Sequence, residues 1–322
     1  MKKFLSAIIS ATMLFLLAGC GQAAESAVEK IRLGLIKGPS GLGAVGLMNN
    51  VKSNETINEY DIEIFGSTDE MKAKVVSGAV DIAALPTNLA SAIYQKNNKD
   101  IKVLAVIALG NLFVLSNDET ITSIADLNGK TVCMSGQAAT PEYIVSGLLD
   151  KAGIKDKVTV EYQSEHTQVL ALAAAGTAPI VILPEPFAST LTSKDTSFKS
   201  VIDLNAEWNV QNPSTPLMMG CLIVKKDFLE KHEQAVMDFM TEYKLSVNSV
   251  LEDMAAASVS AVEHKLIDNA EVARAALPNC GLSYIDGGAM SKQLPEFFKV
   301  LYGNNLAAIG GSLPDDRFYY VQ

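Results

Sequence analysis

Two stretches of this sequence repeat one another at a fixed spacing of 98 positions, without a gap. Residues 78–91 align with residues 176–189, and six of the fourteen aligned positions are identical. The same spacing pairs Gly38 with Gly136. Each copy has the pattern of a strand, a Gly-containing loop, a helix, a short apolar strand, a Leu-Pro turn and a second helix. A repeat of this kind predicts two similar α/β lobes facing each other across a cleft, although any two strand–helix units share some of these features.

Apolar strand patterns alternate with helical patterns along both copies. The expected strands are residues 31–36, 60–65, 81–85, 103–109 and 112–115 in the first lobe, and 130–134, 158–162 and 180–183 in the second, followed by a returning strand at 217–224. Strands that alternate with helices form βαβ units, so we expect an α/β fold in which each lobe is a mostly parallel sheet flanked by helices.

The part of the chain after the returning strand has helical patterns but no third copy of the repeat. We therefore expect it to rejoin the first lobe. Lobe I would comprise residues 30–115 plus 221–322, and lobe II residues 116–220. The chain would then cross between the lobes twice, near 112–118 and near 217–223. Two crossings form a hinge that can close the lobes around a ligand.

The N-terminus has the features of an export signal. Two lysines precede an apolar run over residues 4–17, and a stretch of small residues ends at Cys20. A basic start followed by an apolar segment is typical of a secretory signal peptide, and the stretch before Cys20 resembles the lipobox of bacterial lipoproteins. This resemblance implies removal of residues 1–19, diacylation of Cys20, a tether over residues 20–29 and attachment to the extracytoplasmic face of the cell membrane. The alternative is an ordinary signal peptide with an incidental cysteine.

Composition and charge argue against several kinds of partner. The formal net charge is −10, whereas nucleic-acid binding favours a basic surface. Aromatic residues make up 7% of the chain, with a single Trp, so a sugar site built from stacked rings is not expected. No spacing of His, Cys and Asp suggests a metal site, and no phosphate-binding loop or nucleophile elbow is present. We expect a monomer without a cofactor or metal that is not an enzyme.

Three cysteines follow Cys20 in the sequence. Cys133 lies in an apolar strand pattern and is expected to be a small buried hydrophobic residue. Cys221 and Cys280 form the candidate disulfide pair, because the chain must return from the second lobe near residue 221. Spacing alone does not supply the geometry that such a bond requires.

The candidate ligand site is the set of loops at the carboxyl ends of the strands. Ligands of parallel sheets bind there, and helices that begin there point free N–H groups at electron-rich groups. The residues expected to contact the ligand are Ser40, Gly41, Thr87, Asn88, Thr140, His166 and Glu185, and the neighbouring loops are residues 67–68, 137–141 and 165–167.

The charges near these loops bear on the kind of ligand. None of the three arginines lies in them, although arginine is the usual partner of a carboxylate. An anionic part of the ligand would therefore rest on backbone N–H groups and on Ser, Thr and Asn side chains. In the repeat, Glu185 replaces Thr87, so the second lobe offers a carboxylate where the first offers a hydroxyl. That carboxylate suits an amine, amidine or aminopyrimidine, or it serves only as an acid at a helix N-terminus.

Several segments together resemble the lipoprotein substrate-binding components of ABC importers. They are the lipobox at Cys20, residues 31–36 with the Gly-rich loop that follows, and residues 77–83, 124–130 and 184–187. The most similar group serves nitrate, taurine and other sulfonates, and the pyrimidine precursor of thiamine. The resemblance covers the mature chain. It implies a two-lobed type II periplasmic-binding-protein fold whose ligand is bound by the loops around Ser40, Thr87, Asn88, Thr140 and Glu185.

The implied function is capture of a small polar solute between the lobes and its delivery to a permease. The solute would resemble a sulfonate, nitrate or an aminopyrimidine. Residues 38–43 lack the aromatic-bearing loop expected of a binder of the thiamine precursor. Relatives on the same fold perform chemistry in thiamine-type biosynthesis, so an enzyme is the alternative. The export signal argues against it, because biosynthetic enzymes need cytosolic cofactors.

Overall fold

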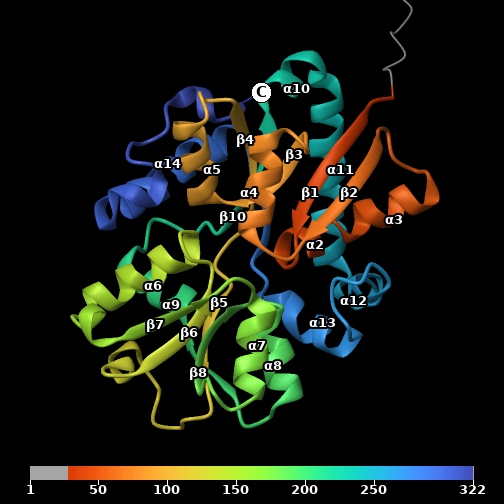
Figure 1. The fold of residues 1–322 in the computed structure, drawn as a ribbon. Coiled ribbons are helices and arrows are strands. Elements are labelled where there is room, and N and C mark those ends of the chain that lie inside the picture. The colour runs from red at the N-terminus through yellow and green to blue at the C-terminus, as the bar shows by residue number, and fades with distance from the viewer. Residues whose placement is uncertain (1–27, 322) are drawn as a thin grey trace, which may run out of the picture.

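The structure is a computed structural model that describes residues 28–321 (Figure 1). These residues form two lobes, each built around one β-sheet with helices on its faces. The predicted signal peptide, Cys20 and residues 20–27 of the predicted tether lie outside the described residues. No helix in the described part of the chain is long and apolar enough to cross a membrane.

Each lobe has one sheet. The first sheet has six strands in the order β11-β4-β10-β3-β1-β2. Its strands are β1 (Lys30–Ile36), β2 (Glu59–Phe65), β3 (Ile82–Pro86), β4 (Ile101–Ala108), β10 (Gly220–Lys225) and β11 (Leu282–Asp286). The second sheet has five strands in the order β7-β6-β8-β5-β9. Its strands are β5 (Leu112–Ser116), β6 (Thr131–Ser135), β7 (Thr159–Gln163), β8 (Ile180–Pro184) and β9 (Lys199–Asp203).

Helices connect the strands and cover the sheets. They are α2 (Pro39–Gly43), α3 (Val45–Ser53), α4 (Thr68–Ser77), α5 (Thr87–Lys96), α6 (Thr140–Lys151), α7 (His166–Ala174), α8 (Phe187–Lys194), α9 (Leu204–Gln211), α10 (Lys226–Lys231), α11 (Glu233–Glu252), α12 (Met254–Glu263), α13 (Ala270–Ala276) and α14 (Gly287–Asn304). Short 3-10 turns lie at η1 (Ile124–Leu127), η2 (Lys155–Lys157), η3 (Leu277–Asn279), η4 (Leu306–Ile309) and η5 (Asp316–Phe318).

The repeat in the sequence corresponds to one topology used twice. In the first sheet β1 pairs in parallel with β2 and β3, and in the second sheet β6 pairs in parallel with β7 and β8. Figure 1 shows one unit above the other. The prediction of two similar α/β lobes is therefore confirmed.

Both sheets are mixed. At the edge of the first sheet β11 pairs antiparallel with β4, and within each sheet one strand runs against both of its neighbours. β10 lies antiparallel between β3 and β4, and β5 lies antiparallel between β8 and β9. These are the first strands that the chain forms after each crossing between lobes. A strand that enters a lobe from the cleft starts where the parallel strands end, so it must run in the opposite direction.

The chain crosses between the sheets at residues 109–111 and again at residues 212–219. The prediction that residues 112–115 continue the first sheet is wrong, because β5 pairs with β8 and β9 in the second. A short apolar run fits the centre of either sheet. The first crossing therefore precedes β5, whereas it was expected near residues 112–118. We therefore place the lobe boundaries at these two crossings.

The lobes are packed together as well as connected. On one face of the first sheet, β1 residues such as Leu33 form a buried cluster with Phe239 of α11. A second buried cluster starts on the other face of that sheet and continues into the second lobe. Within it, Trp208 of α9 lies against Phe297 of α14, with ring centroids 5.5 Å apart. The C-terminal helix α14 therefore joins the two lobes.

The three cysteines of the described residues are all free and buried. Burial of Cys133 in a strand is confirmed, whereas the candidate disulfide between Cys221 and Cys280 is wrong. In the first sheet, β4 lies between β10, which carries Cys221, and β11, which follows Cys280. Two strand spacings amount to roughly 10 Å, which exceeds the Cα–Cα distance of about 7 Å that a disulfide spans.

Candidate functional site

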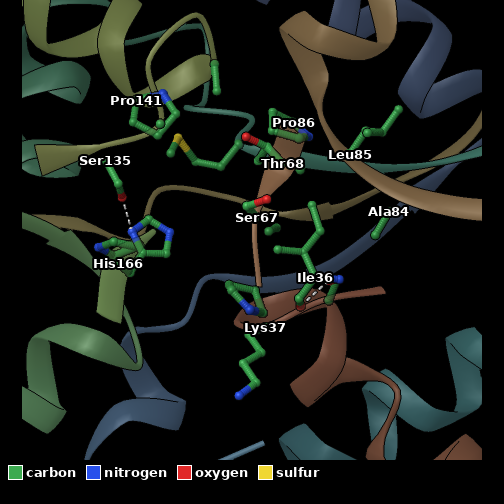
Figure 2. A pocket seen from close by; sticks show the side chains of 18 of the residues that line it. Ile36, Lys37, Ser67, Thr68, Ala84, Leu85, Pro86, Ser135, Pro141 and His166 are labelled. Carbon is green, nitrogen blue, oxygen red and sulfur yellow. Dashed lines mark hydrogen bonds between the residues drawn. The ribbon is translucent and has the colours of Figure 1, made fainter. Parts of the chain in front are cut away.

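A cavity of about 120 Å³ lies between the lobes, near the carboxyl ends of the parallel strands of both sheets (Figure 2). The first lobe contributes Ile36, Lys37, Pro39, Ser40, Gly66, Ser67, Thr68, Ala84, Leu85, Pro86, Ile107, Ala108 and Gly220. The second lobe contributes Ser135, Gly136, Ala139, Pro141, Ser164, Glu165, His166 and Pro184, and the crossings contribute Asn111 and Met219. The predicted cleft is therefore present as a cavity.

The lining combines apolar side chains with hydroxyl groups. Apolar contacts come from Ile36, Leu85, Pro86, Ile107, Pro141, Pro184 and Met219, and hydroxyls from Ser40, Ser67, Thr68, Ser135 and Ser164. Lys37 and Glu165 also line the cavity, but Figure 2 shows the Lys37 side chain pointing away from Ser135 and His166. A lining of this kind suits a small molecule with an apolar part and a polar group.

Two helices of the repeat begin at the cavity. Ser67 caps α4, because its Oγ accepts a hydrogen bond from the N–H of Glu70 (3.2 Å). In the other lobe, α7 begins at His166. The first N–H groups of a helix have no acceptor within the helix, and the helix dipole places partial positive charge there. The cavity therefore favours an anionic group of a ligand.

His166 is a neutral polar group in this cavity. Its Nδ1 shares a hydrogen bond with Ser135 Oγ (Figure 2), and its ring packs on Phe187 with centroids 4.7 Å apart. Burial lowers the pKa of His166 to about 4, so the imidazole is uncharged at neutral pH. Among residues 28–321 no carboxylate is hydrogen-bonded to the ring. The Ser135–His166 pair therefore lacks the third group that orients the histidine of a nucleophilic triad.

Of the residues predicted to contact the ligand, Ser40 and His166 line the cavity. The Ser40 hydroxyl is already engaged, because it donates to the carbonyl of Ile36 (2.8 Å) and accepts from the Ile36 N–H (3.0 Å). Gly41 is buried in α2, where a Cβ would come within 3.0 Å of a methyl group of Leu266. Gly41 thus allows close packing behind the cavity and does not line it.

Thr87 begins α5 and faces the second crossing. Its hydroxyl donates to the carbonyl of Met218 (2.7 Å), and its N–H donates to the carbonyl of Met219 (3.2 Å). Met219 lines the cavity, whereas Thr87 does not. Thr87 therefore positions the crossing that forms part of the cavity wall.

Asn88 and Thr140 bind each other across the lobes. Thr140 Oγ1 donates to Asn88 Oδ1 (2.9 Å), and Asn88 Nδ2 donates to the carbonyl of Ala138 in the second lobe (3.1 Å). Asn88 Nδ2 also donates to the carbonyl of Ala308 within the first lobe (3.0 Å). Both side chains are buried, and neither lines the cavity. We call Asn88, Thr140 and the Ala138 carbonyl the inter-lobe latch.

Glu185 directly follows the lining residue Pro184 but does not itself line the cavity. Its carboxylate accepts hydrogen bonds from the N–H (3.0 Å) and the hydroxyl (2.9 Å) of Ser189 in the first turn of α8. The side chain is buried, and this burial raises the pKa of Glu185. The geometry is that of an acid at a helix N-terminus, the second of the two roles that the sequence allows.

Sequence reasoning missed Asn111 and Ser135 as individual lining residues, although the loops at residues 67–68 and 165–167 were expected near the ligand. Ser135 is the last residue of β6, and Asn111 follows β4 in the first crossing. Both lie at the carboxyl end of a strand, so the rule that selected the other loops applies to them too. Asn111 was overlooked because the crossing was placed several residues too late.

Comparison with known proteins identifies one family. The chain matches the family model described as ABC transporter, phosphonate, periplasmic substrate-binding protein, over residues 48–266. No curated protein matches the sequence.

Solved structures with a similar fold include an ABC transporter protein from Parabacteroides distasonis, with a TM-score of 0.74 and 20% identity, over 90% of this chain and 98% of that one. The alkanesulfonate-binding protein SsuA from Xanthomonas axonopodis pv. citri, bound to MOPS, has a TM-score of 0.70 and 15% identity, over 89% and 94% of the chains. The aliphatic sulphonate-binding protein SsuA from Escherichia coli has a TM-score of 0.68 and 14% identity, over 89% and 92%. These likenesses show the periplasmic-binding-protein fold.

Proposed function

Because this chain belongs to the family of periplasmic substrate-binding proteins of phosphonate ABC transporters, we propose that it captures an organic oxyanion, a phosphonate or a sulfonate, between its lobes. The family consists of non-enzymatic binding proteins that act outside the cytoplasm as the solute-capturing part of an importer. In this proposal the oxyanion occupies the cavity, and the loaded protein delivers it to the permease.

The observation that carries the proposal is a group of free hydroxyl donors beside two helix starts. Ser67, Thr68 and Ser164 line the cavity, and within residues 28–321 none of their hydroxyls donates a hydrogen bond. They lie next to the first N–H groups of α4 and α7. Donors of this kind stabilise an oxyanion in the absence of arginine, because hydrogen bonds to a charged acceptor are stronger than those between neutral groups.

The apolar part of the lining supports an organic oxyanion over nitrate. Leu85, Ile107 and Met219 contribute apolar surface that a bare inorganic anion leaves uncovered. An alkyl group would cover it, with a gain of about 0.8 kcal/mol for each buried CH₂. The cavity therefore matches an oxyanion that carries a short hydrocarbon chain.

A cationic or aminopyrimidine ligand has less support. The carboxylate expected to hold such a ligand was that of Glu185, and Ser189 occupies it instead. Glu165 does line the cavity, with a donor from the Thr167 hydroxyl at 2.9 Å. One carboxylate among several hydroxyl donors fits an anionic head group better than a cationic one.

The proposed lipid tether is compatible with this site. β1 begins at Lys30, directly after the expected tether, and its last residue Ile36 lines the cavity. The tether would therefore enter the first lobe at the amino end of β1, at the opposite end of the strand from the cavity. A protein anchored through Cys20 in this way keeps the cavity accessible to solute.

Thermal unfolding in the presence of candidate solutes tests the proposal. Ethylphosphonate and ethanesulfonate are the oxyanion probes, with nitrate, ethylamine and an aminopyrimidine as competing classes. A ligand that binds only the folded state raises the unfolding temperature in a concentration-dependent way. We expect a rise with at least one of the two oxyanion probes. A rise with ethylamine or the aminopyrimidine alone would contradict the proposal.

Ser67→Ala tests the placement of the head group. Loss of a hydrogen bond to a charged acceptor costs about 1.5–3 kcal/mol, so affinity for the bound oxyanion should fall roughly 10- to 150-fold. Ser77→Ala is the matched control, because Ser77 is exposed at the other end of α4. Equal affinities of the two variants, measured by calorimetry, would remove Ser67 from the site.

A further inference from the structure

The imidazole of His166 is held in one orientation at the wall of the cavity. Its face packs on Phe187 of α8, with ring centroids 4.7 Å apart, and its Nδ1 shares a hydrogen bond with the Oγ of Ser135, the last residue of β6. A ring flipped about its bond to Cβ would place the Cδ2 carbon against the Ser135 hydroxyl and lose this bond. The second ring nitrogen, Nε2, therefore has a fixed direction.

The Nε2 atom of His166 is accessible and has no partner among residues 28–321. The hydrogen bond to Ser135 is the one that the imidazole makes within these residues. In the same part of the chain, the fully buried side-chain polar atoms that lack a partner belong to Asn111, Tyr284 and Tyr319. The unpaired Nε2 is not one of them, so it is open to the cavity that His166 lines. Figure 2 shows this nitrogen on the side of the ring toward Ser67.

The Ser135 hydroxyl decides which ring nitrogen carries the proton. The imidazole is neutral at pH 7, because burial lowers the pKa of His166 to about 4, so one nitrogen is protonated and the other is bare. Among residues 28–321 the Ser135 hydroxyl has no acceptor other than Nδ1. If it donates to Nδ1, its proton is paired and the imidazole proton lies on Nε2. If Nδ1 carries the proton instead, the hydroxyl proton loses its acceptor. The first tautomer is therefore favoured.

We infer that Ser135 is a positioning residue that fixes His166 in the tautomer with its proton on Nε2, and that this N–H donates to the ligand. The donor role rests on the proposed function, whereas the tautomer does not. The proton on Nε2 makes this part of the second lobe a donor, as the hydroxyls of Ser67 and Thr68 are on the first lobe. In the other tautomer Nε2 would direct a lone pair at a bound oxyanion, which would oppose binding.

Nuclear magnetic resonance reads the tautomer directly. In protein labelled with ¹⁵N at histidine, long-range proton–nitrogen correlations distinguish a protonated ring nitrogen from a bare one. The signals that disappear in His166→Gln are those of His166 among the three histidines. We expect the unliganded wild type to carry the proton on Nε2 at neutral pH. A proton on Nδ1 with a bare Nε2 would overturn the inference and leave oxyanion capture standing.

Ser135→Ala removes the hydroxyl that sets the tautomer. The imidazole should then populate both neutral forms, so its nitrogen signals should move toward intermediate values. Ser116→Ala is the matched control, because Ser116 is a buried serine at the end of β5 in the same sheet, and its hydroxyl donates to the carbonyl of Pro179 (3.1 Å). This control should leave the signals of His166 unchanged. An unchanged tautomer in Ser135→Ala would exclude Ser135 as the positioning residue.

Calorimetric titration with ethylphosphonate and ethanesulfonate tests the donor role. The amide N–H of a glutamine can take the place of the Nε2 proton, whereas that of the shorter asparagine lies near the position of Nδ1. His166→Gln should therefore retain most of the affinity for the oxyanion that binds. His166→Asn should lose roughly 10- to 100-fold, because a hydrogen bond to a charged acceptor is lost. Equal losses in the two variants would overturn the donor role.

The two measurements separate the inference from the proposed function. Ser135→Ala should weaken the bound oxyanion about 2-fold for an equal mixture of tautomers, because only the form with the proton on Nε2 is competent. If neither probe binds the wild type, oxyanion capture and the donor role are both overturned, and the spectrum alone decides whether Ser135 sets the tautomer.

Discussion

Replacing Asn88 by alanine tests whether the inter-lobe latch holds the cleft closed. Two of the three hydrogen bonds of Asn88 cross between the lobes, to the Ala138 carbonyl (3.1 Å) and from Thr140 Oγ1 (2.9 Å). At about 0.5–1.5 kcal/mol each, these two bonds favour the closed arrangement by about 1–3 kcal/mol. Loss of both bonds should shift the equilibrium constant between the closed and open forms roughly 5- to 150-fold toward the open form.

Small-angle scattering of the unliganded protein measures this shift without a known ligand. Asn88→Ala should have a larger radius of gyration than the wild type, and Thr140→Val, which removes one of the two crossing bonds, should lie between them. The fluorescence of Trp208, which packs on Phe297 across the lobes, gives a second readout. The apparent affinity for a solute should fall by the same factor as the population of the competent closed form.

Ser91→Ala is the matched control for loss of stability. The Ser91 hydroxyl donates to the carbonyl of Ile309 (2.8 Å), so it joins α5 to η4 as Asn88 does, but entirely within the first lobe. This variant should lower the free energy of unfolding and leave the radius of gyration unchanged. If Asn88→Ala is no more expanded than Ser91→Ala, the latch does not set the closure of the lobes.

Two further predictions concern Glu185 and the membrane anchor. Burial raises the folded-state pKa of Glu185 above its unfolded value, so the stability linked to this group is present below the unfolded pKa and is lost as pH rises through the folded pKa. Glu185→Gln should therefore gain in unfolding temperature relative to wild type as pH rises from about 4 to 8, and a constant difference would refute this. Cys20→Ala should move the protein from the membrane to the soluble fraction, and persistent membrane fractionation would exclude the lipobox.

The two-lobed fold could be predicted because the sequence contains the same unit twice. The repeated segments, residues 78–91 and 176–189, contain β3 and β8, which follow helices α4 and α7. Each of these strands pairs in parallel with the first parallel strand of its lobe, as expected. The first crossing could not be placed in the same way. β5 is a short apolar strand with no feature that distinguishes the two sheets, and only its pairing with β8 and β9 decides the lobe.

The candidate site was predicted at the level of loops but less well at the level of side chains. Strand ends and helix starts fix which loops meet at the cleft, and Ser40 and His166 do line the cavity. The sequence does not show which way a side chain at a helix start turns. The Asn88 side chain accepts a hydrogen bond from Thr140, and the Glu185 carboxylate accepts one from Ser189. Such local partners compete with a ligand for the same polar atoms, and their identity depends on the packed structure.

The most direct test of the central claim is a crystal structure of the protein with ethylphosphonate. The account predicts that the phosphonate lies in the inter-lobe cavity, with its oxygens within hydrogen-bonding distance of Ser67 and of the first N–H groups of α4 or α7, and its ethyl group against Leu85 and Ile107. A phosphonate bound outside the cavity, or a cavity that remains empty at saturating ligand, would contradict it.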